Sequence, residues 1–169
     1  SSSATWSRSA EPSVTQLTLA HQFRRVANLV NGSTLAGLAI ARLGRATVRP
    51  GPHGLVLAEG YTLPFPIAGA FTVGNVVVTP RTFAELESWA PQVLDHEARH
   101  SWQYVCCGVF FLPLYLLAMG WSMARTGDRA ARNAFERWAR LADGGYEDVP
   151  VRPWRAQIKA LTRARRSRR

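Results

Sequence analysis

Apolar positions recur with helical spacing in the first quarter of the chain. A helix is predicted over residues 13–31, where an apolar residue returns every three or four positions: Leu17, Ala20, Phe23, Ala27 and Val30. Asn31-Gly32 ends this helix. Residues 34–43 predict a second helix, short and very apolar, which Gly44 closes.

The middle of the chain predicts a small β-sheet. The breaker cluster Arg49-Pro50-Gly51-Pro52 separates it from the helices. Residues 54–59 predict a short strand, and residues 68–79 predict a buried strand, because β-branched residues are frequent there. We expect a sheet of two or three strands, with residues 73–79 at an edge that could hold an extended peptide.

Helices are predicted again in the second half. Thr82 and Glu85 have capping-box spacing, and Pro91 suits the first turn of a helix over residues 91–105. Residues 105–123 contain no charge, and a last helix is predicted over residues 128–142, before Gly144-Gly145. Together these elements predict an α+β fold, with helices packed on a small sheet.

Length and charge indicate one domain with polar or basic ends. A chain of 169 residues that is 47% hydrophobic can form a single core. We assign a flexible leader to residues 1–12, one domain to residues 13–150 and a basic tail to residues 151–169, which ends in an arginine-rich run. The net charge of +10 fits an anionic partner, such as membrane headgroups, nucleic acid or an acidic protein.

The two cysteines, Cys106 and Cys107, are adjacent, and this geometry disfavours a bridge between them. No disulfide framework is predicted, and the polar leader lacks the apolar stretch of a signal peptide. We therefore expect a cytoplasmic location, with membrane association open. Buried cysteines are usually small core residues, so we expect no metal ligation by this pair.

The candidate chemistry lies in His96-Glu97-Ala98-Arg99-His100, on the helix predicted over residues 91–105. Residues four apart share a helix face, so both imidazoles can reach one zinc ion at about 2.0–2.1 Å. Glu97 is rotated by about 100° from His96 and borders the metal. There it can act as a base on a zinc-bound water. Gln103 follows on the stripe of the two histidines and can support them.

A catalytic zinc site usually has a third protein ligand. Glu136 is the best candidate, because it flanks the apolar face of the last predicted helix. Asp143 is weaker, and Asp95 lies too close to His96 to point the same way. Three tyrosines are candidate oxyanion donors, although core packing is the more common role for each: Tyr104, Tyr115 and Tyr146.

Residues 74–146 resemble the compact gluzincin-type zinc metallopeptidases, in a minimal form found in small bacterial domains. A little under half of the chain carries this resemblance, in the motifs Gly74-Asn75 before Val76-Val77-Val78, His96-Glu97-x-x-His100-x-x-Gln103, Gly108 with Pro113-Leu114-Tyr115-Leu116, Asn133-x-x-Glu136-x-x-Ala139 and Gly144-Gly145-Tyr146. The resemblance implies a minimal zincin-like fold and hydrolysis of a peptide or protein. It also implies zinc on His96, His100 and Glu136, with Glu97 catalytic.

Arg99 departs from the family pattern, which generally has uncharged residues between the glutamate and the second histidine. An inactive or repurposed site therefore stays open. One alternative is a non-catalytic basic subunit that docks on a membrane complex or a ribonucleoprotein, with structural zinc or none. Another is hydrolysis of a non-peptide amide or ester.

Residues 105–123 and the basic tail each have more than one interpretation. For residues 105–123 we favour a buried helix that covers the active-site helix, over peripheral membrane insertion or a membrane span. The arginine-rich tail is either a solvated end or an attachment to phosphates on lipid headgroups or RNA.

Overall fold

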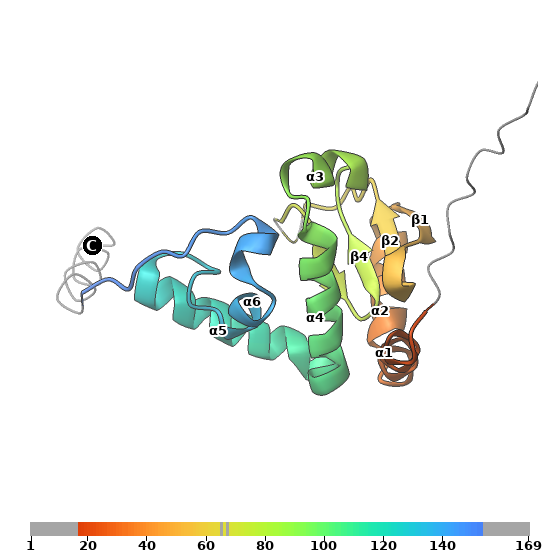
Figure 1. The fold of residues 1–169 in the computed structure, drawn as a ribbon, viewed down its shortest axis with the longest axis horizontal. Coiled ribbons are helices and arrows are strands. Elements are labelled where there is room, and N and C mark those ends of the chain that lie inside the picture. Colours follow the sequence, from red (N-terminus) through yellow and green to blue (C-terminus); the bar gives the residue numbers. More distant parts are fainter. Residues whose placement is uncertain (1–16, 65, 67, 154–169) are drawn as a thin grey trace, which may run out of the picture.

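The computed structural model describes residues 17–153 apart from 65 and 67, and the predicted leader and most of the basic tail lie outside this range. Helices pack around a small sheet in an α+β architecture (Figure 1). The elements are α1 Leu19–Val30, α2 Ser33–Leu43, β1 Thr47–Pro50, η1 Pro52–Gly54, β2 Val56–Glu59, β3 Phe71–Val73, β4 Val76–Val78, α3 Phe83–Trp89, α4 Val93–Cys107, η2 Gly108–Phe110, α5 Phe111–Thr126, α6 Ala134–Trp138 and η3 Leu141–Gly144.

The sheet has four strands in the order β1-β2-β4-β3, where two or three were expected. β2 and β4 are parallel, and the two outer pairs are antiparallel. β1 was missed because Arg49 and Pro50 indicate a break. Proline is nonetheless tolerated on an edge strand, where its missing N–H need not join the ladder.

The predicted single strand over residues 68–79 is a hairpin of β3 and β4. It turns at Gly74, whose φ of 63° is the left-handed conformation that glycine adopts most easily. β4 lies inside the sheet and its three valines are fully buried. The edge expected at residues 73–79 is therefore formed by β3 instead.

Side chains alternate between the two faces of the sheet, and each face has its own helices. Leu57 and Val77 pack with Phe83, Leu86 and Val93 from α3 and the start of α4. On the other side, Ala58, Val76 and Val78 pack with Ala41 of α2. The predicted capping box of Thr82 and Glu85 is present at the start of α3. This two-sided core fixes α4 in front of the sheet (Figure 1).

The chain turns sharply after α4. Gly108 has a φ of 53°, and α5 then leads away from α4 (Figure 1). The interpretation of residues 105–123 as a buried helix is wrong, since most of α5 is exposed. The helical stretch Val93–Thr126 is long and apolar enough to cross a membrane, judged by length and composition alone.

The predicted last helix over residues 128–142 is also wrong in extent. The helical segment α6 begins only after Asn133, whose side chain accepts from the Phe135 amide. It ends before Arg140, which adopts a φ of 63°, and η3 follows. Glu136 lies in the first turn of this short helix.

Candidate metal centre

The structure brings His96, His100 and Glu136 together from two helices. One nitrogen or oxygen of each residue lies within 4.8 Å of the others. The two Nε2 atoms are 3.0 Å apart, and Glu136 Oε2 is 3.1 Å from His96 Nε2 and 3.6 Å from His100 Nε2. All three side chains are buried. This group could hold a metal ion.

The spacing of the three atoms suits a small tetrahedral cation. Zinc bonds of about 2.0–2.1 Å place tetrahedral ligand atoms roughly 3.3 Å apart. Glu136 Oε2 is buried and has no hydrogen-bond partner among the described residues. An unpaired buried acceptor is costly, and a cation would compensate it. The donor set of two imidazoles and one carboxylate is typical of zinc.

Hydrogen bonds turn both Nε2 atoms toward the common point. His96 Nδ1 lies 3.0 Å from the Ala139 carbonyl oxygen, which can only accept. Gln103 Nε2 donates to the Phe135 carbonyl at 2.8 Å, so its Oε1 faces His100 Nδ1, also at 2.8 Å. We therefore assign the proton to Nδ1 in both rings. This leaves each Nε2 lone pair available to a metal, and it fits the supporting role expected for Gln103.

Glu136 is held from its other side by Tyr115 of α5, whose hydroxyl donates to Glu136 Oε1. Burial and the nearby Glu136 charge raise the pKa of this hydroxyl well above its ordinary value, so it stays a donor. Tyr115 thus positions the carboxylate and is not placed as an oxyanion donor.

Glu97 lies beside this group, in a cavity of about 200 Å³. Its side chain is buried, and Oε2 accepts a hydrogen bond of 2.6 Å from Thr72 Oγ1. Thr72 lies on the edge strand β3 and is not among the site residues predicted from the sequence. A polar residue in an otherwise apolar strand was the available signal. The cavity is lined by Gly69, Ala70, Leu86, Trp89, Val93, His96, Glu97, Arg129, Gly144, Gly145 and Tyr146.

Of the three candidate tyrosines, Tyr146 is the one that lines this cavity. Its ring centroid is 6.0 Å from that of His96. Burial, followed by the Glu136 charge, raises the pKa of its hydroxyl, so it remains a proton donor at neutral pH. Tyr104 instead packs against Phe111, with ring centroids 4.3 Å apart. Of the three, Tyr146 is therefore the one that shares a cavity with His96 and Glu97.

The charge of Arg99 faces the loop after α6. Its Nη1 donates to the Ala139 carbonyl at 3.1 Å and pairs with Asp143 Oδ2 at 2.7 Å. Ala139 is also the carbonyl that orients His96. Arg99 thus stabilises the loop that holds the first histidine, and Asp143 is its counterion and not a ligand.

Gly144, which the sequence indicated as a helix end and as part of the resemblance motif, packs against the imidazole of His96. A Cβ at this position would lie 2.6 Å from His96 Cε1 and 2.8 Å from Nε2. Asp95 and Cys106 are exposed and Cys107 is half-buried, and none of them belongs to the ligand group.

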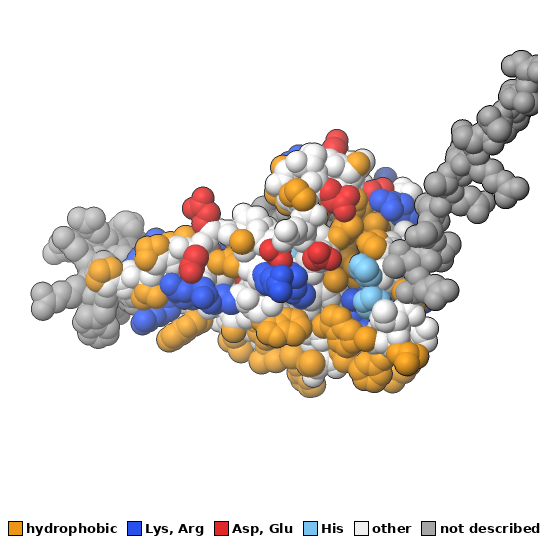
Figure 2. All heavy atoms as spheres, in the orientation of Figure 1, with side chains coloured by type: hydrophobic (Ala, Val, Ile, Leu, Met, Phe, Trp, Pro, Cys, Tyr) orange, Lys and Arg blue, Asp and Glu red, His pale blue; other side chains and the backbone are white. Residues whose placement is uncertain are grey.

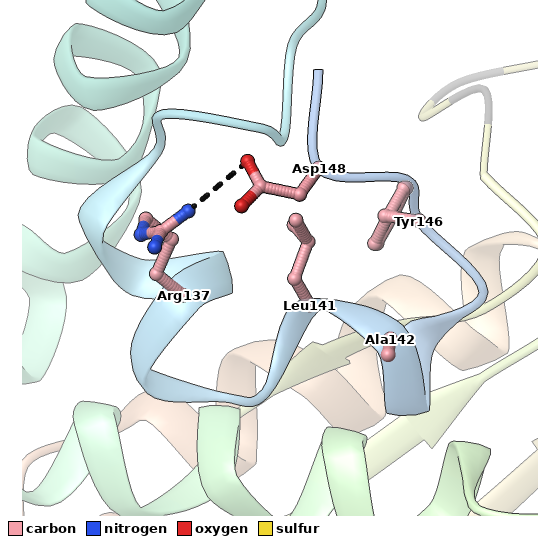
Figure 3. Close-up of a pocket in the computed structure, with 5 residues that line it drawn as sticks. All are labelled: Arg137, Leu141, Ala142, Tyr146 and Asp148. Atoms are coloured by element: carbon pink, nitrogen blue, oxygen red, sulfur yellow. Dashed lines mark hydrogen bonds and ion pairs between the residues drawn. The ribbon is translucent and has the colours of Figure 1, made fainter. Parts of the chain in front are cut away.

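A second cavity of about 280 Å³ also has Tyr146 in its lining (Figure 3). It is lined by Arg137, Leu141, Ala142, Tyr146 and Asp148, and Arg137 Nη1 is 3.3 Å from Asp148 Oδ1 across it. None of the three candidate ligands lines it.

Comparisons with protein families, with curated proteins and with solved structures find no match to this chain.

Proposed function

We propose that this protein is a zinc-dependent hydrolase that cleaves peptide bonds. The main support is that the Nε2 atoms of His96 and His100 and the unpaired Oε2 of Glu136 converge on one buried point. The buried carboxylate of Glu97 lies beside this point. His96, His100 and Glu136 hold the metal. Zinc supplies Lewis acidity there, which polarises a carbonyl and makes water more acidic.

Glu97 is the proton carrier of the reaction. It accepts a proton from the attacking water and delivers it to the departing amine. Its hydrogen bond from Thr72 keeps the carboxylate directed into the cavity. Tyr146 donates a hydrogen bond to the oxygen that becomes negative as the carbonyl is attacked.

The substrate that fits this site best is an extended peptide. β3 is an edge strand, paired only with β4 among the described residues. It borders Glu97 through Thr72, and Ala70, next to its first residue, lines the cavity. A peptide added alongside β3 by main-chain hydrogen bonds would pass the cavity.

The variant Glu97→Gln tests the assignment. It keeps the volume of the side chain but cannot carry a proton, so hydrolysis of a fluorescent unstructured protein should fall by about 10²–10⁴-fold. Zinc content should stay at the wild-type value, because Glu97 is not a ligand. Glu87→Gln, on the exposed side of α3, is the matched control and should change neither quantity.

Two results would contradict the proposal. If Glu97→Gln hydrolyses the substrate as fast as wild type, Glu97 is not the proton carrier. If zinc-loaded wild type cleaves neither peptides nor simple esters and amides, the metal is structural and the non-catalytic alternative holds. Cleavage of esters or amides without cleavage of peptides would restrict the hydrolase to non-peptide substrates.

A further inference from the structure

α1 turns its apolar side toward solvent and its polar side toward the fold, the reverse of an ordinary surface helix. At 100° per residue, four apolar side chains fall within roughly 60° of its circumference. They point away from the fold and are exposed by 59–84%: Leu19, Phe23, Val26 and Val30. The buried residues on the opposite side are Arg24 and Asn28, which are polar.

The polar side of α1 fixes this orientation. Arg24 Nη2 donates to the His53 carbonyl at 2.7 Å, and Asn28 Nδ2 donates to the Ser101 carbonyl of α4 at 2.9 Å. Rotating α1 about its axis to bury its apolar side would break both of these hydrogen bonds. It would also place apolar side chains opposite the two backbone carbonyls, which would then lose their donors. The outward stripe is therefore a property of the fold.

A second exposed apolar surface lies on η2 and α5. The inward side of α5 carries Tyr115, Ser122 and Thr126, which hydrogen-bond to Glu136 and to the Asp128 carbonyl. The remaining circumference is apolar and exposed, with Phe110 at 70%, Leu117 at 72% and Trp121 at 61%. Further exposed members are Val109, Leu112, Leu114, Leu116 and Met123.

The two surfaces lie on the same side of the molecule. Figure 2 shows hydrophobic side chains gathered along one edge, over α1 and the junction of α4 with α5, while acidic side chains appear above them. α1 and α4 pack against each other, which brings the two surfaces close. Apolar patches of this extent on a protein surface indicate an interaction site.

The charge around these surfaces identifies the partner. The helices α1, α2, η2 and α5 contain no acidic residue, and three of their arginines lie outside the core: Arg25 and Arg42 are exposed and Arg125 is half-buried. Arg125, near the end of α5, lies over the Trp121 ring at 5.4 Å from its centroid, an aromatic and cationic pair suited to a headgroup region. Apolar side chains with arginines and without carboxylates match an anionic lipid surface.

We propose that α1, η2 and α5 form a docking surface for an anionic phospholipid bilayer, with their apolar side chains in the interface. α5 has 16 residues and is about 24 Å long, shorter than the roughly 30 Å hydrocarbon core. α4 cannot extend it through the bilayer, because α4 carries His96 and His100 inside the fold. The protein therefore lies on one leaflet, and a second copy is disfavoured because two arginine-bearing surfaces would face each other.

Flotation of the full chain with vesicles tests this inference. The protein should float with vesicles of equal parts phosphatidylcholine and phosphatidylglycerol, and more weakly with pure phosphatidylcholine. Leu117→Glu and Phe23→Glu should each lower the partition coefficient at least about tenfold, since each removes a large apolar side chain from the interface. The arginine-rich tail is unchanged in every variant, so it cannot produce these differences.

A matched pair of variants separates the effect of the docking surface from the effect of adding a negative charge anywhere on the protein. Ala124→Glu on exposed α5 should weaken flotation, whereas Ala84→Glu on exposed α3, away from the apolar edge, should not. Circular dichroism shows that each variant folds. Equal flotation of Leu117→Glu and wild type overturns the proposal. So does a lipid-free dimer that Leu117→Glu dissociates. Neither result bears on hydrolysis, so this inference and the proposed function fail separately.

Discussion

α1 and α4 pack against each other, and each turns polar side chains inward, with different consequences. In α1, Arg24 and Asn28 donate to backbone carbonyls of neighbouring segments. In α4, His96 and His100 direct acceptor nitrogens toward one another and toward an unpaired carboxylate oxygen. Buried donors bonded to carbonyls anchor a helix, whereas buried acceptors that face one another could hold a cation.

The outward sides of the two regions differ as well. The three candidate ligands, two of them on α4, are buried. α1 and α5 leave their apolar sides uncovered. The molecule thus has a polar interior site on one side and an apolar exterior on the other, and each should respond to its own substitutions.

Glu136→Gln should have the largest effect, and it acts on the candidate metal centre. The amide is a weaker ligand than the carboxylate, so zinc affinity should fall by more than the roughly 10–100-fold typical of a supporting residue. Competition with a chelator measures this loss. Glu147→Gln, exposed after η3, is the matched control. Wild-type affinity in Glu136→Gln would remove this residue from the metal centre.

Gln103→Met should have an intermediate effect. It removes the acceptor for His100 Nδ1 and the bond to the Phe135 carbonyl, while keeping most of the volume. Zinc affinity should drop by about 10–100-fold without loss of the third ligand. The same chelator titration gives the value. An unchanged affinity would mean that the orientation of His100 does not depend on Gln103.

Asn28→Leu should have the smallest effect, and it separates anchoring from metal binding. The substitution removes the bond from α1 to the Ser101 carbonyl, so the free energy of unfolding should fall by about 1–2 kcal/mol. Zinc stoichiometry of the folded protein should stay the same. Urea denaturation gives the first quantity and metal analysis the second. Loss of zinc from folded Asn28→Leu would show that the two helices are not separable in this way.

The spacing of four between His96 and His100 is local, so the pairing of the two imidazoles could be predicted from sequence. Glu136 was also predicted as the third candidate ligand, although the helix predicted around it is longer than α6. The break at Arg140 depends on a positive φ that composition does not reveal. Thr72 and Gly144 contact the site across long sequence separations, and for that reason the sequence did not predict them.

Periodicity predicts a helix but does not say which side packs inward. The repeat over Phe23 and Val30 correctly indicated α1, yet both side chains point outward. The same limit applies to residues 105–123, where high apolar content favoured burial but α5 is exposed. In α1 the buried residues are polar, and in α5 Ser122 and Thr126 are buried beside Phe111, so a hydrophobic pattern does not register much of the packing.

X-ray absorption spectroscopy of the zinc-loaded full chain is the most direct test of the metal centre. The structure predicts two imidazole nitrogens and a carboxylate oxygen at about 2.0–2.1 Å and no sulfur. Sulfur at about 2.3 Å would instead assign the metal to Cys106 or Cys107. That result, or failure of the chain to retain zinc, would contradict the account.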